Sequence, residues 1–414
     1  MEPAAFHFPR NREHNNMSAN RILSGMRPTG SLHLGHYHGV IKNWVELQHS
    51  HECFFMVADW HALTTNFDDV SIIGKSINEM VIDWLASGVD PEKSTVFVQS
   101  KVPQHAELHL ALSMVTPLGW LERVPTYKDQ MEKLSHKDLT TYGFLGYPLL
   151  QAADILVYKA GLVPVGEDQV PHIELTREVA RRFNHMFGRE PNFEELAKAA
   201  VKKIGKAGKD FDRLRTAYLQ DGNAEALEKA REILAASQNL GAADRERLYG
   251  WLENKGKIIL PECEAKLTAA SKMPGLDGQK MSKSYGNTIT MREAPEAVSK
   301  KIRGMPTDPA RVRRTDPGTP AKCPVWQLHE VYSDGETKEW VKAGCTTAGI
   351  GCLDCKQPVI DAVVREQQPM FERAEKYLNN PKLVTEILAD GNARAEKVAR
   401  ETMNDVRAAM GLGY

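Results

Sequence analysis

The stretch Thr29–Gly39, "TGSLHLGHYHG", contains three histidines and three glycines and has no acidic residue. The preceding residues "NRILSG" predict a short buried strand, and the following "YHGVIKNWVELQ" places apolar side chains at helical spacing. The stretch is therefore a glycine-rich turn between a strand and a helix.

Such a turn can hold an anion, because glycines let the backbone approach closely and a helix N-terminus presents free N–H groups. A zinc site on His33, His36 and His38 is the competing interpretation, but the turn offers neither a further fixed ligand nor a supporting carboxylate. A tight turn with surface histidines is the third interpretation. A second signal elsewhere in the chain has to decide.

Composition excludes several classes of protein. The chain has 414 residues, 53 of them basic and 54 acidic, so it is long enough for two or three domains and has no global charge that indicates nucleic acid. It contains no run of eighteen apolar residues, and residues 1–18 lack the apolar core of a signal peptide. We expect no membrane partner and interpret residues 1–18 as a loose leader, with Met17 as an alternative start.

The pattern along the chain predicts the domains. Short apolar runs such as "CFFMVAD" and "STVFVQS" alternate with amphipathic helices, which is typical of a doubly wound, Rossmann-like α/β fold with a parallel sheet. We assign residues 19–188 and 259–301 to this catalytic domain. Residues 189–258, rich in alternating charge, predict a helical insert, and residues 302–414 predict an all-helical C-terminal domain.

The second signal is "KMSKS", Lys280–Ser284, which lies between "PGLDGQ" and "YGN". Two lysines and two serines on a glycine-flanked loop are suited to gripping a polyphosphate and neutralising a departing pyrophosphate. Alone, such a loop is usually a solvated turn. Together with the histidine turn it predicts a nucleotide site.

The two motifs resemble the HIGH and KMSKS signatures of class I aminoacyl-tRNA synthetases. "ILSGMRPTGSLHLGHYHGVIKNW", "VADWHALTT", "YPLLQAADILVYKAGLVPVGEDQ" and "GQKMSKSYGN" further resemble the bacterial tryptophanyl-tRNA synthetases. This family joins tryptophan to tRNA through an adenylate. The alternatives are a tyrosyl-tRNA synthetase, a small-molecule adenylyltransferase, which would lack the lysine loop, and a non-catalytic RNA-binding or redox-sensing paralogue.

The resemblance assigns the ATP site. It implies that His33 and His36 stabilise the transition state while Lys280 and Lys283 neutralise the pyrophosphate, with Mg²⁺ held mainly by the phosphates. Gly35 leaves room for the adenine, and Arg27 stands where many members have glutamine. His38 receives no role and is expected on the helix surface. The ATP-binding residues are Arg27, Pro28, Thr29, Gly35, His36, Gly166, Glu167, Asp168, Lys280, Met281, Ser282, Lys283 and Ser284.

Helical geometry gives the first evidence for a tryptophan pocket. Tyr147, Gln151 and Asp154 are spaced i, i+4 and i+7, so their side chains share one helix face within the apolar segment "LLQAADILVY". A buried carboxylate there needs a partner. The resemblance implies that Asp154 accepts the indole N–H, and that Tyr147 and Gln169 hold the α-amino group. Gln151 replaces the methionine of many relatives.

Four of the six cysteines cluster near the C-terminus, as Cys323, Cys345, Cys352 and Cys355, whereas Cys53 and Cys263 are expected to be buried bystanders. Four thiolates can bind Zn²⁺ or a [4Fe–4S] cluster, and their spacing does not choose between the two. A disulfide pair is the further alternative. A subgroup of bacterial tryptophanyl-tRNA synthetases has a similar pattern that binds [4Fe–4S], and this resemblance favours the cluster.

The resemblance also implies partners. We expect L-tryptophan, ATP and tRNA(Trp), a homodimer with one tRNA reaching across both subunits, a cytoplasmic location and no DNA. The C-terminal domain would contact the anticodon region. The basic triplet Arg311, Arg313 and Arg314 is expected either to touch phosphate, to fold against the catalytic domain, or to be a solvated face.

Overall fold

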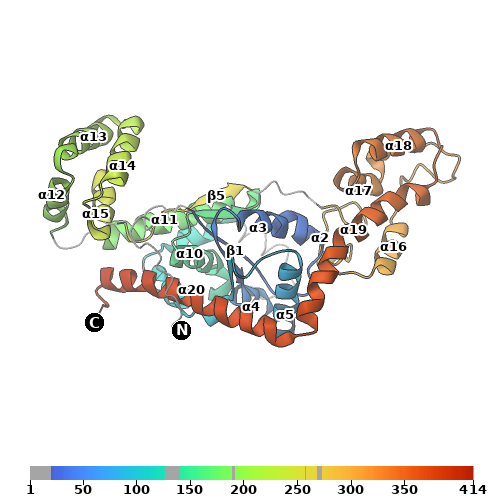
Figure 1. Cartoon of the computed structure of the whole chain (residues 1–414), viewed down its shortest axis with the longest axis horizontal. Coiled ribbons are helices and arrows are strands. Elements are labelled where there is room, and N and C mark those ends of the chain that lie inside the picture. The colour runs from blue at the N-terminus through green and yellow to red at the C-terminus, as the bar shows by residue number, and fades with distance from the viewer. Residues whose placement is uncertain (1–19, 126–139, 189–191, 257, 268–272, 414) are drawn as a thin grey trace, which may run out of the picture.

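A parallel sheet of five strands forms the centre of the computed structural model, which describes residues 20–125, 140–188, 192–256, 258–267 and 273–413 (Figure 1). The predicted leader lies outside these residues. The strand order is β3-β2-β1-β4-β5, and every pairing is parallel. This arrangement confirms the predicted doubly wound α/β fold. The strands are β1 (Arg21–Met26), β2 (Glu52–Val57), β3 (Ser94–Val98), β4 (Leu162–Val165) and β5 (Glu264–Leu267).

Strand β1 is the topological switch point of the sheet. It pairs with β2 on one side, where Ile22 lies opposite Cys53, and with β4 on the other, where Ile22 lies opposite Leu162. The chain builds outward from β1 to β3 and then returns to the far side of β1. In such sheets, ligands bind beyond the carboxyl ends of the strands at this point.

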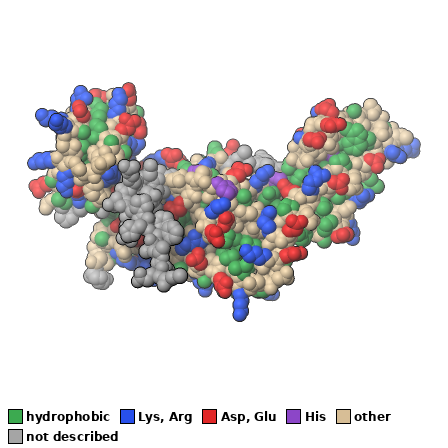
Figure 2. All heavy atoms as spheres, in the orientation of Figure 1, with side chains coloured by type: hydrophobic (Ala, Val, Ile, Leu, Met, Phe, Trp, Pro, Cys, Tyr) green, Lys and Arg blue, Asp and Glu red, His purple; other side chains and the backbone are tan. Residues whose placement is uncertain are grey.

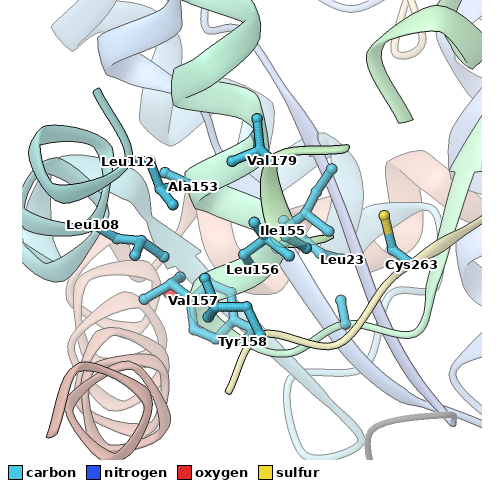
Figure 3. Packing of buried hydrophobic residues seen from close by; sticks show 14 of the residues in the cluster. Leu23, Leu108, Leu112, Ala153, Ile155, Leu156, Val157, Tyr158, Val179 and Cys263 are labelled. Carbon is cyan, nitrogen blue, oxygen red and sulfur yellow. The ribbon is translucent and has the colours of Figure 1, made fainter. Parts of the chain in front are cut away.

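Alternating side chains of the strands supply two apolar cores. Leu23 and Phe54 belong to one core, together with residues of α10 (Tyr147–Val157) and α11 (Val170–Phe187). Figure 3 shows part of this core, with Leu23 labelled. Ile22 and Phe55 belong to the other core. Successive side chains of a strand point to opposite faces of the sheet. Because both faces are covered by apolar cores, residues of both sets are apolar, and the strands have continuous apolar sequences. The elements around the sheet are α2 (Leu34–His36), η1 (Tyr37–Ile41), α3 (Lys42–Leu47), α4 (Asp59–Asn66), α5 (Ser71–Ala86), η2 (Gln99–Lys101), α6 (Gln104–Ser113), α7 (Leu118–Glu122), α9 (Tyr142–Leu145), α10 (Tyr147–Val157), η3 (Glu167–Gln169) and α11 (Val170–Phe187).

The predicted insert contains helices with a core of their own, built around Phe211, Leu234 and Leu248. Figures 1 and 2 show it as a lobe that projects from one end of the molecule. Its base is closed by Asn184, whose Oδ1 accepts the backbone N–H groups of Ile259 (2.9 Å) and Leu260 (3.0 Å). Its elements are α12 (Phe193–Lys203), η4 (Gly205–Ala207), α13 (Gly208–Asp221), α14 (Ala224–Ala236) and α15 (Ala242–Leu252).

The C-terminal part is helical and forms the opposite end of the molecule (Figure 1). Its last helix does not stay there, because Ala395 and Met403 pack into one core of the sheet and Leu388 packs into the other. Among the described residues, the helices are all too short or too polar to cross a membrane. The elements from the lysine loop onward are η5 (Lys283–Tyr285), α16 (Pro295–Arg303), η6 (Pro320–Lys322), α17 (Pro324–Tyr332), α18 (Gly335–Thr346), α19 (Cys352–Leu378) and α20 (Pro381–Ala409).

Helix α20 covers the exposed edge of strand β3. The side chain of Asn392 accepts the free N–H of Val98 at 2.9 Å, so the helix satisfies a backbone donor of the edge strand. This contact requires Gly391, because a Cβ atom there would lie 1.8 Å from the carbonyl oxygen of Val96. The glycine therefore sets how closely α20 can approach the sheet.

We predict that Gly391→Ala destabilises the protein by about 1–3 kcal/mol, because the backbone of α20 must move away from Val96. Thermal or denaturant unfolding measures the loss. Gly335→Ala is the control, because a Cβ atom on Gly335 would meet nothing within 4 Å. Equal stability of the two variants would show that α20 does not depend on this close approach.

Candidate active site

A cavity of about 1470 Å³ opens at the carboxyl ends of β1 and β4. Among the predicted residues, Pro28 is buried outside the lining, and the side chain of Ser284 lies outside the described residues. The remaining predictions for ATP and tryptophan all line the cavity, although they come from segments far apart in the sequence. They are Arg27, Thr29, His33, Gly35, His36, Tyr147, Gln151, Asp154, Gly166, Glu167, Asp168, Gln169, Lys280, Met281, Ser282 and Lys283.

The histidine turn fixes both of its imidazole rings through backbone hydrogen bonds. The N–H of Gly35 donates to Nδ1 of His33 at 3.1 Å, and the N–H of His33 donates to Nδ1 of His36 at 3.2 Å. Both Nδ1 atoms are therefore acceptors, which assigns the ring proton of a neutral histidine to Nε2. Gly35 is needed here because a Cβ atom on it would lie 2.8 Å from the His33 ring.

The two histidines are neutral near pH 7. Burial lowers the pKa of His33 to about 4, and the nearby Lys283 and Lys280 add to this shift. Burial also lowers the pKa of His36 to about 3, with further contributions from His33 and Lys283. Each ring can therefore offer an Nε2–H donor to a phosphate oxygen without carrying a positive charge.

The lysine loop is tied to the histidine turn. The ammonium of Lys283 donates to the carbonyl oxygens of Thr29 (3.0 Å) and Gly30 (2.9 Å), some 250 residues away in the chain. The loop itself is held by Asn287, whose Oδ1 accepts the N–H of Ser282 at 2.7 Å. The two motifs therefore meet at the cavity mouth, as the sequence predicts.

The environment of Lys283 makes its charge sensitive to pH. Burial lowers the pKa of its ammonium to about 8, Asp83 opposes this shift, and Arg27 adds to it. Arg27 lines the same cavity, so the site gathers cations around the place where a polyphosphate would lie.

Asp154 is held by a buried polar network that the sequence analysis missed. Its Oδ2 lies 2.6 Å from Nε2 of His61, and its Oδ1 lies 2.6 Å from Nδ1 of His105. Gln99 donates to Oδ1 at 2.8 Å, and the other nitrogen of His105 lies 2.7 Å from the hydroxyl of Tyr158. The polar residues in otherwise apolar helices were the available signal, but their partners come from different elements.

Burial would raise the pKa of Asp154, but interactions with His61 and His105 outweigh it and lower the pKa to about 2. The carboxylate is therefore charged and acts only as an acceptor. Within the described residues, Nδ1 of His61 is buried without a hydrogen-bond partner, although His61 lines the cavity.

His38 does not lie on a helix surface, so that prediction was wrong. Its side chain is only 10% exposed, and its Nε2 lies 3.0 Å from Glu366 and 3.1 Å from the hydroxyl of Tyr332. Sequence reasoning could not place these partners, which belong to helices about 300 residues further along the chain.

Comparison with known proteins decides the family. The model of the class I tRNA synthetases for tryptophan and tyrosine matches residues 15–206 and 252–366. The tryptophan–tRNA ligase of Ralstonia nicotianae is 68% identical over 96% of this chain and 100% of its own length. That of Thermotoga maritima is 44% identical over 95% of this chain and 100% of its own length.

This chain belongs to the bacterial tryptophanyl-tRNA synthetases. Its activity is that of the family, the ATP-dependent ligation of tryptophan to tRNA, and the tyrosyl and non-catalytic alternatives are not supported. The tryptophanyl-tRNA synthetase of Campylobacter jejuni, solved with ADP and tryptophan, has a TM-score of 0.70 and 26% identity; the match covers 95% of this chain and 100% of that one.

The family model omits residues 207–251, which contain α13, α14 and most of α15. The cavity residues described above all lie inside the matched ranges. The histidine turn, the lysine loop and the Asp154 network therefore lie in the parts of the chain that match the family model, whereas most of the projecting lobe lies outside that match.

The four clustered cysteines gather around the starts of α17 and α19. Cys323 precedes α17, Cys352 and Cys355 lie in the first turns of α19, and Cys345 lies near the end of α18. Burial raises the pKa of Cys355 to about 12, and the other three thiols add to the shift, so all four lie within electrostatic range. Among the described residues, however, three or more metal-binding side chains do not come together as a metal site. Cys53 and Cys263 are buried, as predicted.

The basic triplet divides between interior and surface. Arg311 is buried and donates to the carbonyl oxygen of Ile350 at 2.5 Å, and its Nη1 lies 3.9 Å from the sulfur of Cys345. Arg313 and Arg314 are exposed. Arg311 therefore supports the segment between α18 and α19, which separates Cys345 from Cys352, while the other two remain on the surface.

Lys283 gives this synthetase a predicted alkaline limit. Its ammonium is charged below a pKa of about 8, so kcat/KM for ATP should fall as the pH rises through that value. Lys283→Arg should abolish this decrease in kcat/KM, because arginine keeps its charge at alkaline pH. ATP–pyrophosphate exchange measured from pH 6 to 10 tests this. Lys280→Arg is the control and should show the same decrease in kcat/KM as the wild-type protein. If Lys283→Arg also shows this decrease, another group causes it.

Proposed function

We propose that the cavity forms tryptophanyl-adenylate, with the phosphates held between the histidine turn and the lysine loop. The observation that carries this proposal is the convergence of three groups on one cavity: the Nε2–H donors of His33 and His36 and the ammonium of Lys283. Donors of this kind favour a transition state in which negative charge develops on phosphate oxygens.

The reaction follows from these positions. A carboxylate oxygen of tryptophan attacks the α-phosphorus of ATP, and the bond from that phosphorus to the bridging oxygen breaks as pyrophosphate leaves. His33 and His36 donate to the phosphate oxygens, and Lys280 and Lys283 neutralise the leaving group. Mg²⁺ is expected with ATP in a class I synthetase and would screen the phosphate charge. Transfer of the tryptophanyl group to the terminal ribose of tRNA(Trp) follows.

The remaining lining residues would orient the two substrates. Gly35 would lie against the adenine, and Gly166 with Asp168 would lie near the ribose. Arg27 would contact a phosphate or the tryptophan carboxylate, and its charge lowers the pKa of Lys283. These roles come from the family resemblance, and the position of each residue on the cavity supports them.

Asp154 would read the indole ring. Within the described residues, its Oδ1 receives donors from His105 and Gln99, whereas its Oδ2 receives one from His61. Oδ2 therefore keeps a lone pair for the indole N–H. Tyr147 and Gln169 line the same cavity and would hold the α-amino group, and Gln151 would border the ring.

We predict that Asp154→Asn raises the KM for tryptophan and weakens selectivity against an analogue whose indole N–H is replaced by sulfur. A site built around a hydrogen bond can discriminate by about 10⁴ to 10⁵, since the wrong substrate leaves a buried partner unpaired. Pyrophosphate exchange with tryptophan, the sulfur analogue and tyrosine measures this.

The wild-type protein is the reference in that experiment and should respond to tryptophan but not to tyrosine. Circular dichroism checks that the variant is folded, because the substitution leaves His61 and His105 without a charged partner. If a folded Asp154→Asn variant still distinguishes tryptophan fully from the sulfur analogue, Asp154 does not bind the indole N–H, and Nδ1 of His61 is the next candidate acceptor.

We further propose a cytoplasmic homodimer in which one tRNA spans both subunits. Exposed apolar side chains on α6, α7, α9 and the segment between α6 and α7 support an interface that involves these elements, because apolar side chains left in water commonly mark such contacts. They are Leu110, Met114, Leu118 and Tyr142, each more than half exposed.

We also propose the division into domains that the sequence predicts. Residues 19–188 and 259–301 would form the catalytic unit, 189–258 a peripheral insert, and 302–414 the region that contacts the anticodon.

The cysteines would hold a [4Fe–4S] cluster, with Zn²⁺ as the alternative. The chemistry of the donors supports this, because the thiols of α18, of α19 and of the residue before α17 lie within electrostatic range of one another. Their side chains are not arranged as a metal site among the described residues, so they would have to close around the group. When bound, it would crosslink the starts of α17 and α19 with the end of α18, away from ATP.

Metal analysis of protein purified without oxygen tests the cluster. We expect about four irons per chain and a brown colour. Cys352→Ser should lose the iron, whereas Cys263→Ser, which changes a buried cysteine outside the group, should keep it. One zinc per chain and no iron would overturn the cluster in favour of a zinc site.

A further inference from the structure

His38 connects the histidine turn to the C-terminal helices. It lies two residues beyond His36 in the π-helix η1, a rare geometry that is frequent at functional sites. Tyr332 donates its hydroxyl to Oε2 of Glu366 at 2.8 Å, and Nε2 of His38 lies 3.0 Å from that same oxygen. Because the carboxylate only accepts and the hydroxyl proton is already used, Nε2 of His38 carries the proton of this contact.

The residue after Glu366 holds the other side of the same turn. Gln367 is 1% exposed, and its side chain donates to the carbonyl oxygen of Thr290 at 2.7 Å. Thr290 forms an isolated antiparallel bridge with His33. The neighbouring backbone bonds, from Leu34 to Ile289 at 3.0 Å and from Met291 to Leu32 at 3.1 Å, extend this pairing.

We propose that His38 is a positioning residue for adenylate formation, and that Glu366 and Gln367 of α19 clamp the histidine turn from its two sides. His38 fixes the helix that follows the turn, and Thr290 fixes the extended residue that opens it. This inference rests on the proposed role of His33 and His36, and it adds residues that touch neither ATP nor tryptophan.

The clamp matters because the rings of His33 and His36 are oriented by the backbone of the turn itself. A shift of η1 or of residues 289–291 would move both Nε2–H donors together. A displacement of about 1 Å can lower a rate by 10²-fold, since the donors must meet oxygens of the transition state. The contacts are well shielded, with 10% of the His38 side chain and 21% of the Glu366 side chain exposed.

The test measures ATP–pyrophosphate exchange by His38→Leu, His38→Gln and Glu366→Leu in the full-length protein. We expect kcat to fall about ten- to a hundred-fold in His38→Leu while the KM for tryptophan is unchanged. His38→Gln should recover most of the rate, because its amide can donate to Glu366. The double variant His38→Leu/Glu366→Leu should be no slower than the worse single variant, since each single variant already removes the contact between His38 and Glu366.

Asp405→Leu is the matched control, because it removes another contact between the C-terminal helices and the catalytic body, the 2.8 Å bond from Lys159 to Asp405, away from the turn. It should keep the wild-type kcat. Wild-type kcat in a folded His38→Leu variant, or an equal loss in Asp405→Leu, would overturn the clamp. Tryptophan-dependent exchange by the wild-type protein tests the proposed function separately, so the two failures are distinguishable.

Discussion

The pairing of β1 with both β2 and β4 is the constraint on which the site depends. It places the end of β1, which leads into the histidine turn, beside the end of β4, which leads into Gly166. Parallel strands present their carboxyl ends at one edge, and the crevice at a switch point stays open because the connecting helices leave in opposite directions. The cavity occupies this crevice, and the lysine loop closes it through the bonds from Lys283.

The two halves of the site solve opposite electrostatic problems. The half proposed to bind phosphate contains Arg27, Lys280 and Lys283 around two histidines that burial keeps neutral. The histidines therefore add no positive charge that would repel the three cations. The half proposed to bind tryptophan contains the buried carboxylate of Asp154, which hydrogen bonds from His61, His105 and Gln99 stabilise. A buried charge without such partners would be neutralised instead. In the proposed role of Asp154, selectivity for a substrate N–H would therefore depend also on His61, His105 and Gln99, which hold its carboxylate.

The sequence predicted features whose cause is local. Strand β1, the glycine-rich turn, the helix face of Tyr147, Gln151 and Asp154, and the loop at Lys280 can all be read from short-range pattern and spacing. The sequence did not predict the partners of Asp154 and His38, because hydrogen bonds between distant elements leave no periodic signal. Packing of α20 against β3 was missed for the same reason, although Gly391 within a long helix was a visible anomaly.

Helix α19 connects the cysteine cluster to the proposed clamp on the histidine turn. It carries Cys352 and Cys355 in its first turns, and Glu366 and Gln367 in its middle. Eleven residues separate Cys355 from Glu366, which corresponds to about 16 Å along a helix axis. Further on, Arg373 donates to the carbonyl oxygen of Ala86 at the end of α5, so the second half of α19 is anchored to the catalytic body. A group bound by the cysteines would therefore stiffen a helix whose middle carries the proposed clamp on the histidine turn, so it would act on catalysis through the position of that helix.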